Sequence, residues 1–239
     1  MSVSHPLDNP VWAALDSTHS HFARVHGSAR AYVEPVSPFM GTQRLDAQGW
    51  ADLARLDDSA RLIRNEITDI PNGAKVVFRA GLRQMVAPVV DVFETRHTTR
   101  PLTIADVPAM LDLTDRTIPG PFRERTIDLG GYIGIFAPCD DHSHDNREVL
   151  MAMAGRRMQT PDYCEISAVC TDPTFLRQGA AAQLTRMVAA EIQSEGKTAF
   201  LHVSDENPKG GLLYESLGFT VRARLEVAAV VFRDDSSHS

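Results

Sequence analysis

The most constraining feature of this sequence is a strand-like run that passes through a short turn of small residues into a long helix. Residues 163–170 (YCEISAVC) are mostly apolar or β-branched, and the helical pattern after residue 179 carries Leu184, Val188 and Ile192 on one face. The connection contains glycine and three consecutive alanines. Because such a helix must pack back onto the sheet that contains the strand, the pattern predicts an α/β fold.

The small residues at the start of this helix leave its first backbone N–H groups accessible. These groups have no partner inside the helix, and the helix dipole favours an anion beside them. Arg177 adds a positive charge two residues before Gly179. A phosphate site and a tight turn that only serves packing explain the segment equally well, so the turn does not decide between them.

The remaining elements follow from apolar spacing and from turn residues. Thr103 and Asp106 resemble a capping box and predict a helix that Pro119 and Gly120 end. Further helices are expected at 11–26, 46–56 and 208–217, and strands at 76–79, 85–93, 132–137, 149–154, 163–170, 199–203 and in the segment that ends at 231. The pattern is more regular after residue 97 than before it.

The composition is that of a soluble globular protein and excludes some classes of function. Of 239 residues, 43 % are hydrophobic and 23 % charged, and the net charge of −7 argues against non-specific binding of nucleic acid. No apolar run approaches the ~18 residues of a membrane span, and residues 1–10 do not resemble a signal peptide. We therefore expect a cytoplasmic protein without a membrane partner.

The cysteines are expected to be reduced thiols. There are three, Cys139, Cys164 and Cys170, so they cannot all pair within the chain. Cys164 and Cys170 lie six residues apart in one expected strand, where a rise of ~3.3 Å per residue places them beyond disulfide reach. No basic neighbour of Cys170 in the sequence indicates a lowered pKa, so we expect this cysteine to be a structural residue.

A second motif follows about 30 residues after the helix turn. The segment 207–219 (NPKGGLLYESLGF) places Asn207 at a helix entrance and Tyr214 two turns inside it. Together with Leu176–Ala181, it resembles motifs A and B of the GNAT superfamily of acyl-CoA N-acyltransferases. Leu176 stands where the family usually has Gln or Arg, and Gly210 stands where it usually has Ala.

The resemblance covers residues 98–233 and implies a fold and an activity. Residues 164–171 and 201–203 are similar to the glycine acyltransferase-like branch of the superfamily. The implied fold is a mixed, mostly antiparallel sheet flanked by helices over residues 98–239, with a smaller α/β region at 1–97. The implied reaction is direct transfer of an acetyl group from acetyl-CoA, or of another acyl group from its acyl-CoA, to a primary amine, without a metal.

The resemblance also assigns roles to individual residues. Tyr214 would donate a proton to the departing sulfur, and Glu165 would accept the amine's proton directly or through a water molecule. The residues implied to bind the cofactor comprise the strand backbone, the helix start and the helix cap: Ala168, Val169, Cys170, Arg177, Gln178, Gly179, Ala180, Ala181, Ala182 and Asn207.

Each of these roles has a structural alternative. Tyr214 could be an aromatic that packs beside Phe219, and Asn207 caps a helix whatever else it does. Glu165 could be a solvated strand residue, and His202 is another candidate base. Strict alternation places Glu165 on the face opposite Cys170, unless a bulge changes its direction.

Other polar clusters carry weaker signals. His142, His144 and three aspartates (Asp140, Asp141 and Asp145) have a metal-like composition, but a solvated loop is favoured. In the fold that the resemblance implies, the loop at residues 117–126 would shape the acceptor site. The flanking Arg116, Arg123 and Arg125 could bind the carboxylate of an amino-acid acceptor, although exposed helix-end charges are the simpler interpretation.

The acceptor and the assembly are less specified by the motifs than the cofactor is. The acceptor is expected to be a small-molecule amine or amino acid, and a homodimer is one possible assembly. A non-catalytic protein that binds CoA and regulates in response to it is the alternative function. Residues 1–97 carry no motif for chemistry, and a role in recruiting a protein substrate is compatible with them.

Overall fold

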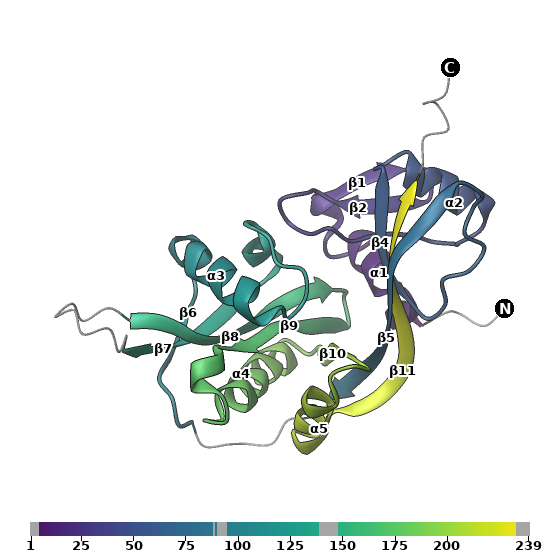
Figure 1. Cartoon of the computed structure of the whole chain (residues 1–239). Coiled ribbons are helices and arrows are strands. Elements are labelled where there is room, and N and C mark those ends of the chain that lie inside the picture. Colours follow the sequence, from purple (N-terminus) through teal and green to yellow (C-terminus); the bar gives the residue numbers. More distant parts are fainter. Residues whose placement is uncertain (1–4, 88, 90–94, 139–147, 233–239) are drawn as a thin grey trace.

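Eight strands form one continuous sheet through the whole molecule (Figure 1). The computed structural model describes residues 5–87, 89, 95–138 and 148–232. Neighbouring strands are antiparallel except for one parallel pair, β9 and β10. The order across the sheet is β4 (Ser59–Arg64), β11 (Thr220–Phe232), β5 (Ala74–Ala87), β10 (Thr198–Ser204), β9 (Tyr163–Thr171), β8 (Glu148–Gln159), β7 (Tyr132–Pro138) and β6 (Thr99–Pro101). The expected mixed, mostly antiparallel sheet is confirmed.

Helices cover both faces of this sheet around β7, β8 and β9. Helix α3 (Val107–Thr117) packs in one apolar cluster with Tyr132, and α4 (Ala180–Ser194) packs in another with Ile133. Adjacent strand residues point to opposite faces, so the two clusters lie on either side of the sheet. The expected capping box, Thr103 with Asp106, is present just before α3.

The N-terminal part adds a small three-stranded sheet and two short helices. These are α1 (Pro10–Leu15), β1 (Ala23–His26), β2 (Ala29–Tyr32), β3 (Met40–Thr42) and α2 (Ala47–Ala54). The expectation of one helix over 11–26 is wrong, because its last four residues pair with β2 as a hairpin. Gly27 closes that hairpin with a φ of 51°, in the left-handed region that favours glycine. Local apolar spacing did not reveal the partner strand that stabilises this alternative.

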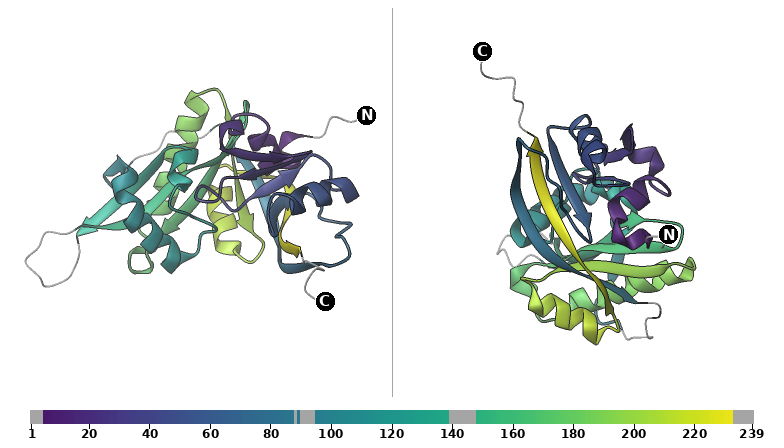
Figure 2. Two further views of the ribbon diagram at one scale, coloured as in Figure 1. Left: turned by 90° about the horizontal axis from the view of Figure 1, so that it is seen from above. Right: turned by 90° about the vertical axis from the view of Figure 1, so that its right-hand side faces the viewer.

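The residues before 98 also build part of the main sheet. Strand β5 pairs with both β11 and β10, and β4 pairs with β11. Figure 2 shows β5 and β11 side by side along their length. The boundary expected between residues 97 and 98 therefore does not divide the sheet, and the two strands expected at 76–79 and 85–93 form one strand as far as residue 87.

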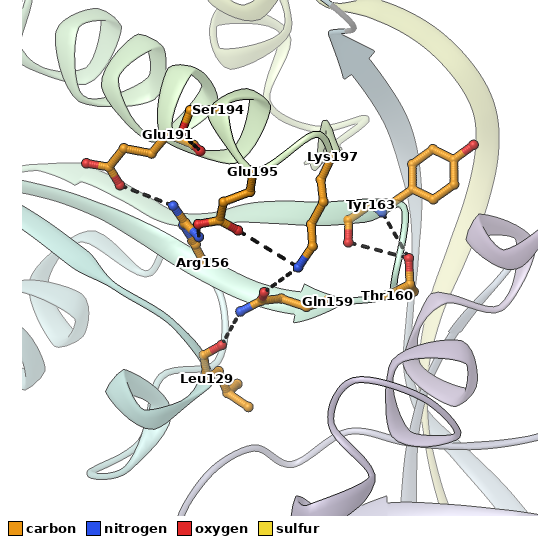
Figure 3. A network of polar contacts seen from close by, with 9 residues as sticks. All are labelled: Leu129, Arg156, Gln159, Thr160, Tyr163, Glu191, Ser194, Glu195 and Lys197. Carbon is orange, nitrogen blue, oxygen red and sulfur yellow. Dashed lines mark hydrogen bonds and ion pairs between the residues drawn. The ribbon is translucent and has the colours of Figure 1, made fainter.

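Ion pairs attach the C-terminal end of α4 to the sheet (Figure 3). Arg156 on β8 pairs with Glu191 at 3.3 Å and with Glu195 at 2.5 Å. Lys197 donates to the side chain of Gln159, whose amide in turn donates to the Leu129 carbonyl. At the opposite end of α4, where the expected phosphate site lies, the Gln183 side chain binds the backbone of Arg96 and His97.

Candidate active site

The parallel strands β9 and β10 separate near their middle and leave a cavity between them. Their pairing ends where Phe200 lies opposite Glu165. Beyond this point β9 pairs only with β8, and β10 only with β5. The cavity has a volume of about 340 Å³ and is lined by residues 166–171 of β9 and 202–204 of β10. The cavity edge of β9 therefore presents backbone groups that no strand covers.

A bulge in β9 lies in this cavity wall. Ala168 has a φ of 51°, and the register with β8 shifts between Ser167 and Cys170. Cys164 therefore packs in the cluster on the α4 face, whereas Cys170 packs on the α3 face, although strict alternation would place both on one face.

Burial raises the pKa of Cys170 to about 11 and that of Cys164 to about 12. Both remain thiols, as expected of structural residues, while Cys139 lies outside the described residues.

The turn before α4 leaves the first backbone donors of the helix without a helical partner. Arg177 and Gly179 have φ values of 66° and 83°. The first helical hydrogen bond runs from the Gln183 N–H to the Gly179 carbonyl, so the N–H groups of residues 180–182 precede it. A Cβ atom built on Gly179 would meet no atom within 4 Å. The space beside this turn is therefore open, as a bound phosphate requires.

Tyr214 and Asn207 both line the cavity from α5 (Pro208–Ser216) and its entrance. Within the described part of the chain, the Tyr214 hydroxyl has no hydrogen-bond partner, and its ring packs edge-on against Phe219. Burial raises the pKa of Tyr214 to about 12, so its hydroxyl keeps the proton at neutral pH. The Asn207 side-chain oxygen accepts a hydrogen bond from the Gly210 N–H, which makes Asn207 the helix cap.

Packing explains why α5 has glycine at positions 210 and 211. A Cβ atom at Gly210 would lie 2.7 Å from the Asn207 side-chain nitrogen, and one at Gly211 would lie 2.3 Å from the Arg83 guanidinium. Alanine at 210, the residue usual in the family motif, would therefore displace Asn207. This departure fits the tight cap in this chain.

Glu165 is the last residue of β9 that pairs with β10, and it is fully buried. Arg157 binds both of its oxygens, at 2.7 and 2.8 Å, and His202 Nδ1 lies 2.7 Å from Oε1. Burial alone would raise the pKa of Glu165, but the charge and hydrogen bonds of Arg157, together with His202, hold it well below its usual range. Glu165 is therefore an ionised carboxylate whose oxygens are occupied, rather than the solvated residue of the alternative interpretation.

His202 is held on its other side by Gln84 of β5. The Gln84 side-chain nitrogen lies 2.9 Å from the Leu7 carbonyl and 3.0 Å from His202 Nε2, and the Gln84 oxygen accepts a 2.5 Å hydrogen bond from Arg222. This orientation directs an amide N–H at His202 Nε2, so the imidazole donates from Nδ1 to Glu165. The lone pair of His202 Nε2 therefore already accepts a hydrogen bond from Gln84.

Arg157 and Gln84 are the site residues that sequence analysis missed. Neither lies in a motif, and Gln84 is 118 positions away from His202 in the chain. Glu165 stands in a mostly apolar strand, and a glutamate that such a strand buries requires a cation or hydrogen-bond donors beside it. This was the signal in the sequence that could have suggested such partners. Arg157 also lies 5.0 Å above the ring of Phe39, so the N-terminal part contributes to its surroundings.

The three arginines beside the expected acceptor loop all have carboxylate partners. Arg116 pairs with Asp112 and Asp172, whereas Arg123 and Arg125 each pair with one acidic residue, Glu34 and Asp128 respectively. These pairs favour the interpretation of the arginines as surface charges. The loop itself is at the site, because Ile118 and Pro119 line the cavity.

No metal centre is present among the described residues, which contain no group of three or more His, Cys, Asp or Glu side chains that could hold an ion. The histidine and aspartate cluster at 140–145 lies outside them. None of the described helices is long and apolar enough to cross a membrane.

Comparison with known proteins identifies the family. Residues 146–228 match the FR47-like protein family. A solved structure from Novosphingobium aromaticivorans DSM 12444, assigned to the GNAT family of acetyltransferases, is 32 % identical, with a TM-score of 0.85 over 97 % of this chain and 100 % of that chain. The chain belongs to the GNAT family. The GNAT fold is therefore confirmed together with the resemblance of motifs A and B, whereas the glycine acyltransferase-like branch stays a prediction.

A more distant GNAT structure shows the same fold. The GCN5-related N-acetyltransferase from Kribbella flavida is 16 % identical, with a TM-score of 0.60 over 94 % of this chain and 97 % of that chain. Its alignment also includes most of the N-terminal part, so that part belongs to the shared architecture. No curated protein matches the sequence.

Proposed function

We propose that this GNAT protein transfers an acetyl group from acetyl-CoA to the amine of a small molecule. The observation that carries the proposal is the separation of β9 and β10 beyond Glu165 and Phe200, which creates a cavity lined by an uncovered strand edge and by the Tyr214 side chain. Tyr214 is only partly buried, and its hydroxyl, which has no hydrogen-bond partner in the described part of the chain, is available to donate to a molecule bound in the cavity. The site therefore supports catalysis in addition to binding.

The residues present fit an acyl-CoA molecule. Backbone groups of Ala168, Val169 and Cys170 line the cavity and are available to a pantetheine arm. The open turn at Gly179, with the N–H groups of residues 180–182, suits a pyrophosphate, because helix N-termini favour anions. The exposed side chains of Arg177 and Gln178 flank that turn, and Asn207 lines the cavity beside the pantetheine path.

When bound, the acyl thioester supplies an activated carbonyl carbon. In the proposed reaction, the amine nitrogen forms a bond to this carbon, and the bond from carbon to sulfur breaks. Tyr214 donates its proton to the departing sulfur, since a pKa raised to about 12 keeps the hydroxyl protonated. The nitrogen then has one proton to lose.

We further propose that the proton from the amine leaves through water and not to Glu165. Four donors surround the Glu165 carboxylate: two from Arg157, the Met158 N–H and His202. Gln84 occupies the remaining nitrogen of His202. In this arrangement, Glu165 stabilises the point where β9 and β10 separate, and a neutral amine from solution is the reacting species.

A coupled assay tests the proposed function. The purified protein is mixed with acetyl-CoA and a panel of primary amines and amino acids, and released CoA thiol is measured. Its thermal stability with CoA is measured in parallel, because a ligand that binds the native state raises the melting temperature. Amine-dependent thiol release supports the proposal. A CoA-induced stability increase without turnover would favour the non-catalytic binding protein, and no stability increase at millimolar CoA would reject the cofactor.

A further inference from the structure

A second cavity adjoins the proposed acetyl-transfer site. It has a volume of about 610 Å³ and lies over β4, β5 and β11. Two residues of the acceptor loop and three polar residues of the separation point belong to the walls of both cavities: Ile118, Pro119, Arg157, His202 and Ser204. A molecule in the second cavity can therefore extend one end toward Tyr214.

The strand register gives this cavity an apolar wall that leads away from the transfer site. On β5, Leu82, Ala80 and Phe78 share one face, because alternate strand residues point the same way. Leu82 lies opposite Ser204 of β10, so the row begins at the shared wall. Phe78 lies opposite Ala229 of β11, which in turn lies opposite Arg61 of β4. The apolar row therefore ends level with an arginine.

Arg61 has no counter-charge in the described part of the chain. It is half-buried, and it forms neither a hydrogen bond nor an ion pair through its guanidinium group there. Burial lowers the pKa of Arg61, and the charge of Arg123 lowers it further. The Arg61 guanidinium is therefore a cation in the cavity wall that is available to pair with the anionic group of a bound molecule.

The other arginines that line this cavity and its neighbour do not share this property. Arg61 also lines a neighbouring cavity of about 660 Å³, together with Arg24 and Arg123. There, Arg24 pairs with Asp57, and Arg123 pairs with Glu34. Arg61 is thus the arginine of this region that is available to a ligand.

We propose that the acceptor is an amine with a carboxylate at the far end of an apolar chain, and that Arg61 binds this carboxylate. The inference rests on the proposed acetyl transfer. Exposed Glu206 lines the same cavity next to the shared wall, so its negative charge disfavours a carboxylate at that end and favours the orientation in which the carboxylate lies at Arg61.

The length of the row sets the kind of acceptor. Gln84, which contacts His202, and Phe78, which is level with Arg61, are separated by six residues of β5. At a rise of ~3.3 Å per residue this corresponds to roughly 20 Å along the strand, which the curvature of the sheet and the length of the arginine side chain shorten. An α-amino acid is too short to span such a row, whereas an ω-amino carboxylate or a short peptide is not.

Matched acceptors test this proposal. The protein with acetyl-CoA is assayed by thiol release against linear alkylamines, ω-amino carboxylates of the same chain lengths and α-amino acids. We expect the long ω-amino carboxylates to have the highest kcat/KM. Arg61→Gln should lower kcat/KM for them by about 10- to 100-fold and leave the alkylamines unchanged, because a hydrogen-bonded charge contact is lost. Arg61→Lys should restore part of the activity.

Arg123→Gln is the matched control. It removes the same charge from the neighbourhood of Arg61, but Arg123 does not line the second cavity, so the preference for carboxylates should persist. An equal loss for both acceptor classes in Arg61→Gln, or a wild-type preference for α-amino acids, would overturn the proposal. Failure of the proposed function looks different, because the wild-type protein would then acetylate none of the amines.

If no amine reacts, binding tests Arg61 independently of turnover. The melting temperature is measured with 10-aminodecanoate and with decylamine, without acetyl-CoA. A stability increase caused by 10-aminodecanoate alone in the wild type, and absent in Arg61→Gln, would support the anion site. No increase with either compound, together with no turnover, would overturn it.

Discussion

Glu165 Oε1 and His202 Nδ1 lie 2.7 Å apart at the position where β9 and β10 stop pairing. The hydrogen bond crosses from one strand to the other just beyond their last paired residues. Arg157 binds the same carboxylate and Gln84 binds the same imidazole, so β5, β8, β9 and β10 are connected through side chains at the point where the sheet opens. This buried polar network links the two walls of the cavity at its closed end.

Removing the Glu165 charge should destabilise the fold. Glu165→Gln leaves the Arg157 guanidinium buried without its anion, and breaking a buried pair in this way typically costs about 3–5 kcal/mol. Urea denaturation measures this loss. A catalytic base would behave differently, with normal stability and a low kcat. Unchanged stability together with a large loss of kcat would show that Glu165 takes part in proton transfer.

The pH dependence of the reaction should follow the amine. If a neutral amine reacts and its proton leaves to water, kcat/KM rises with pH until it reaches the pKa of the acceptor itself. Two acceptors of similar shape and different pKa should therefore show curves displaced by that pKa difference. Curves that rise at one common pH for both amines would instead reveal a base on the protein.

Tyr214→Phe should lower turnover without weakening CoA binding. The ring and its contact with Phe219 remain, but the proton for the sulfur is lost. A general acid typically contributes ~10²–10⁴-fold, so kcat should fall by that order while CoA affinity changes little. Wild-type kcat, with chemistry shown to be rate-limiting, would remove Tyr214 from the mechanism. Loss of CoA affinity as well would make its hydroxyl an anchor for the cofactor.

Gly179→Val should weaken CoA binding, and Gly196→Val provides the control. The two glycines lie at opposite ends of α4, have φ values of 83° and 77°, and have no atom within 4 Å of a built Cβ. Both substitutions therefore introduce similar backbone strain, of about 1–2 kcal/mol. Only the side chain at 179 would occupy the expected pyrophosphate site. Equal CoA affinity of the two variants would show that Gly179 serves the turn alone.

His19 should make the fold sensitive to mild acid. The side chain is buried against the Tyr32 hydroxyl, and burial lowers the pKa of His19 to about 4. Between pH 6.5 and 4 the unfolded chain binds a proton that the folded chain rejects, so the free energy of unfolding falls as pH decreases, by up to about 3 kcal/mol. This stability is fully present above pH 6.5.

His19→Gln tests this linkage, because glutamine can keep a hydrogen bond to Tyr32 but does not titrate. The difference in the free energy of unfolding between pH 7 and pH 4, measured by urea denaturation, should be smaller in the variant. An identical difference in both proteins would assign the acid sensitivity to other groups.

The sequence by itself determined the elements whose signals are local. The strand at 163–170, the turn at Gly179, the capping box at Thr103 and the helix of Tyr214 each depend on residues a few positions apart. Hydrogen bonds within a helix and caps at its ends involve such neighbours, so their patterns can be read directly. The family motifs are built from these same segments.

Only the tertiary structure decided the surroundings of Glu165 and Arg61. Glu165 reaches His202 37 positions away, and His202 reaches Gln84 118 positions away. Strand β1 replaced an expected helix because β2 supplied a partner for its backbone. Pairing between distant strands sets which side chains meet. The bulge at Ala168 adds one residue to β9, so the side chains after it point to the opposite face of the sheet from the one that strict alternation predicts. Periodicity records only the neighbours of a residue along the chain, whereas burial and charge compensation depend on the partners that the sheet brings to it.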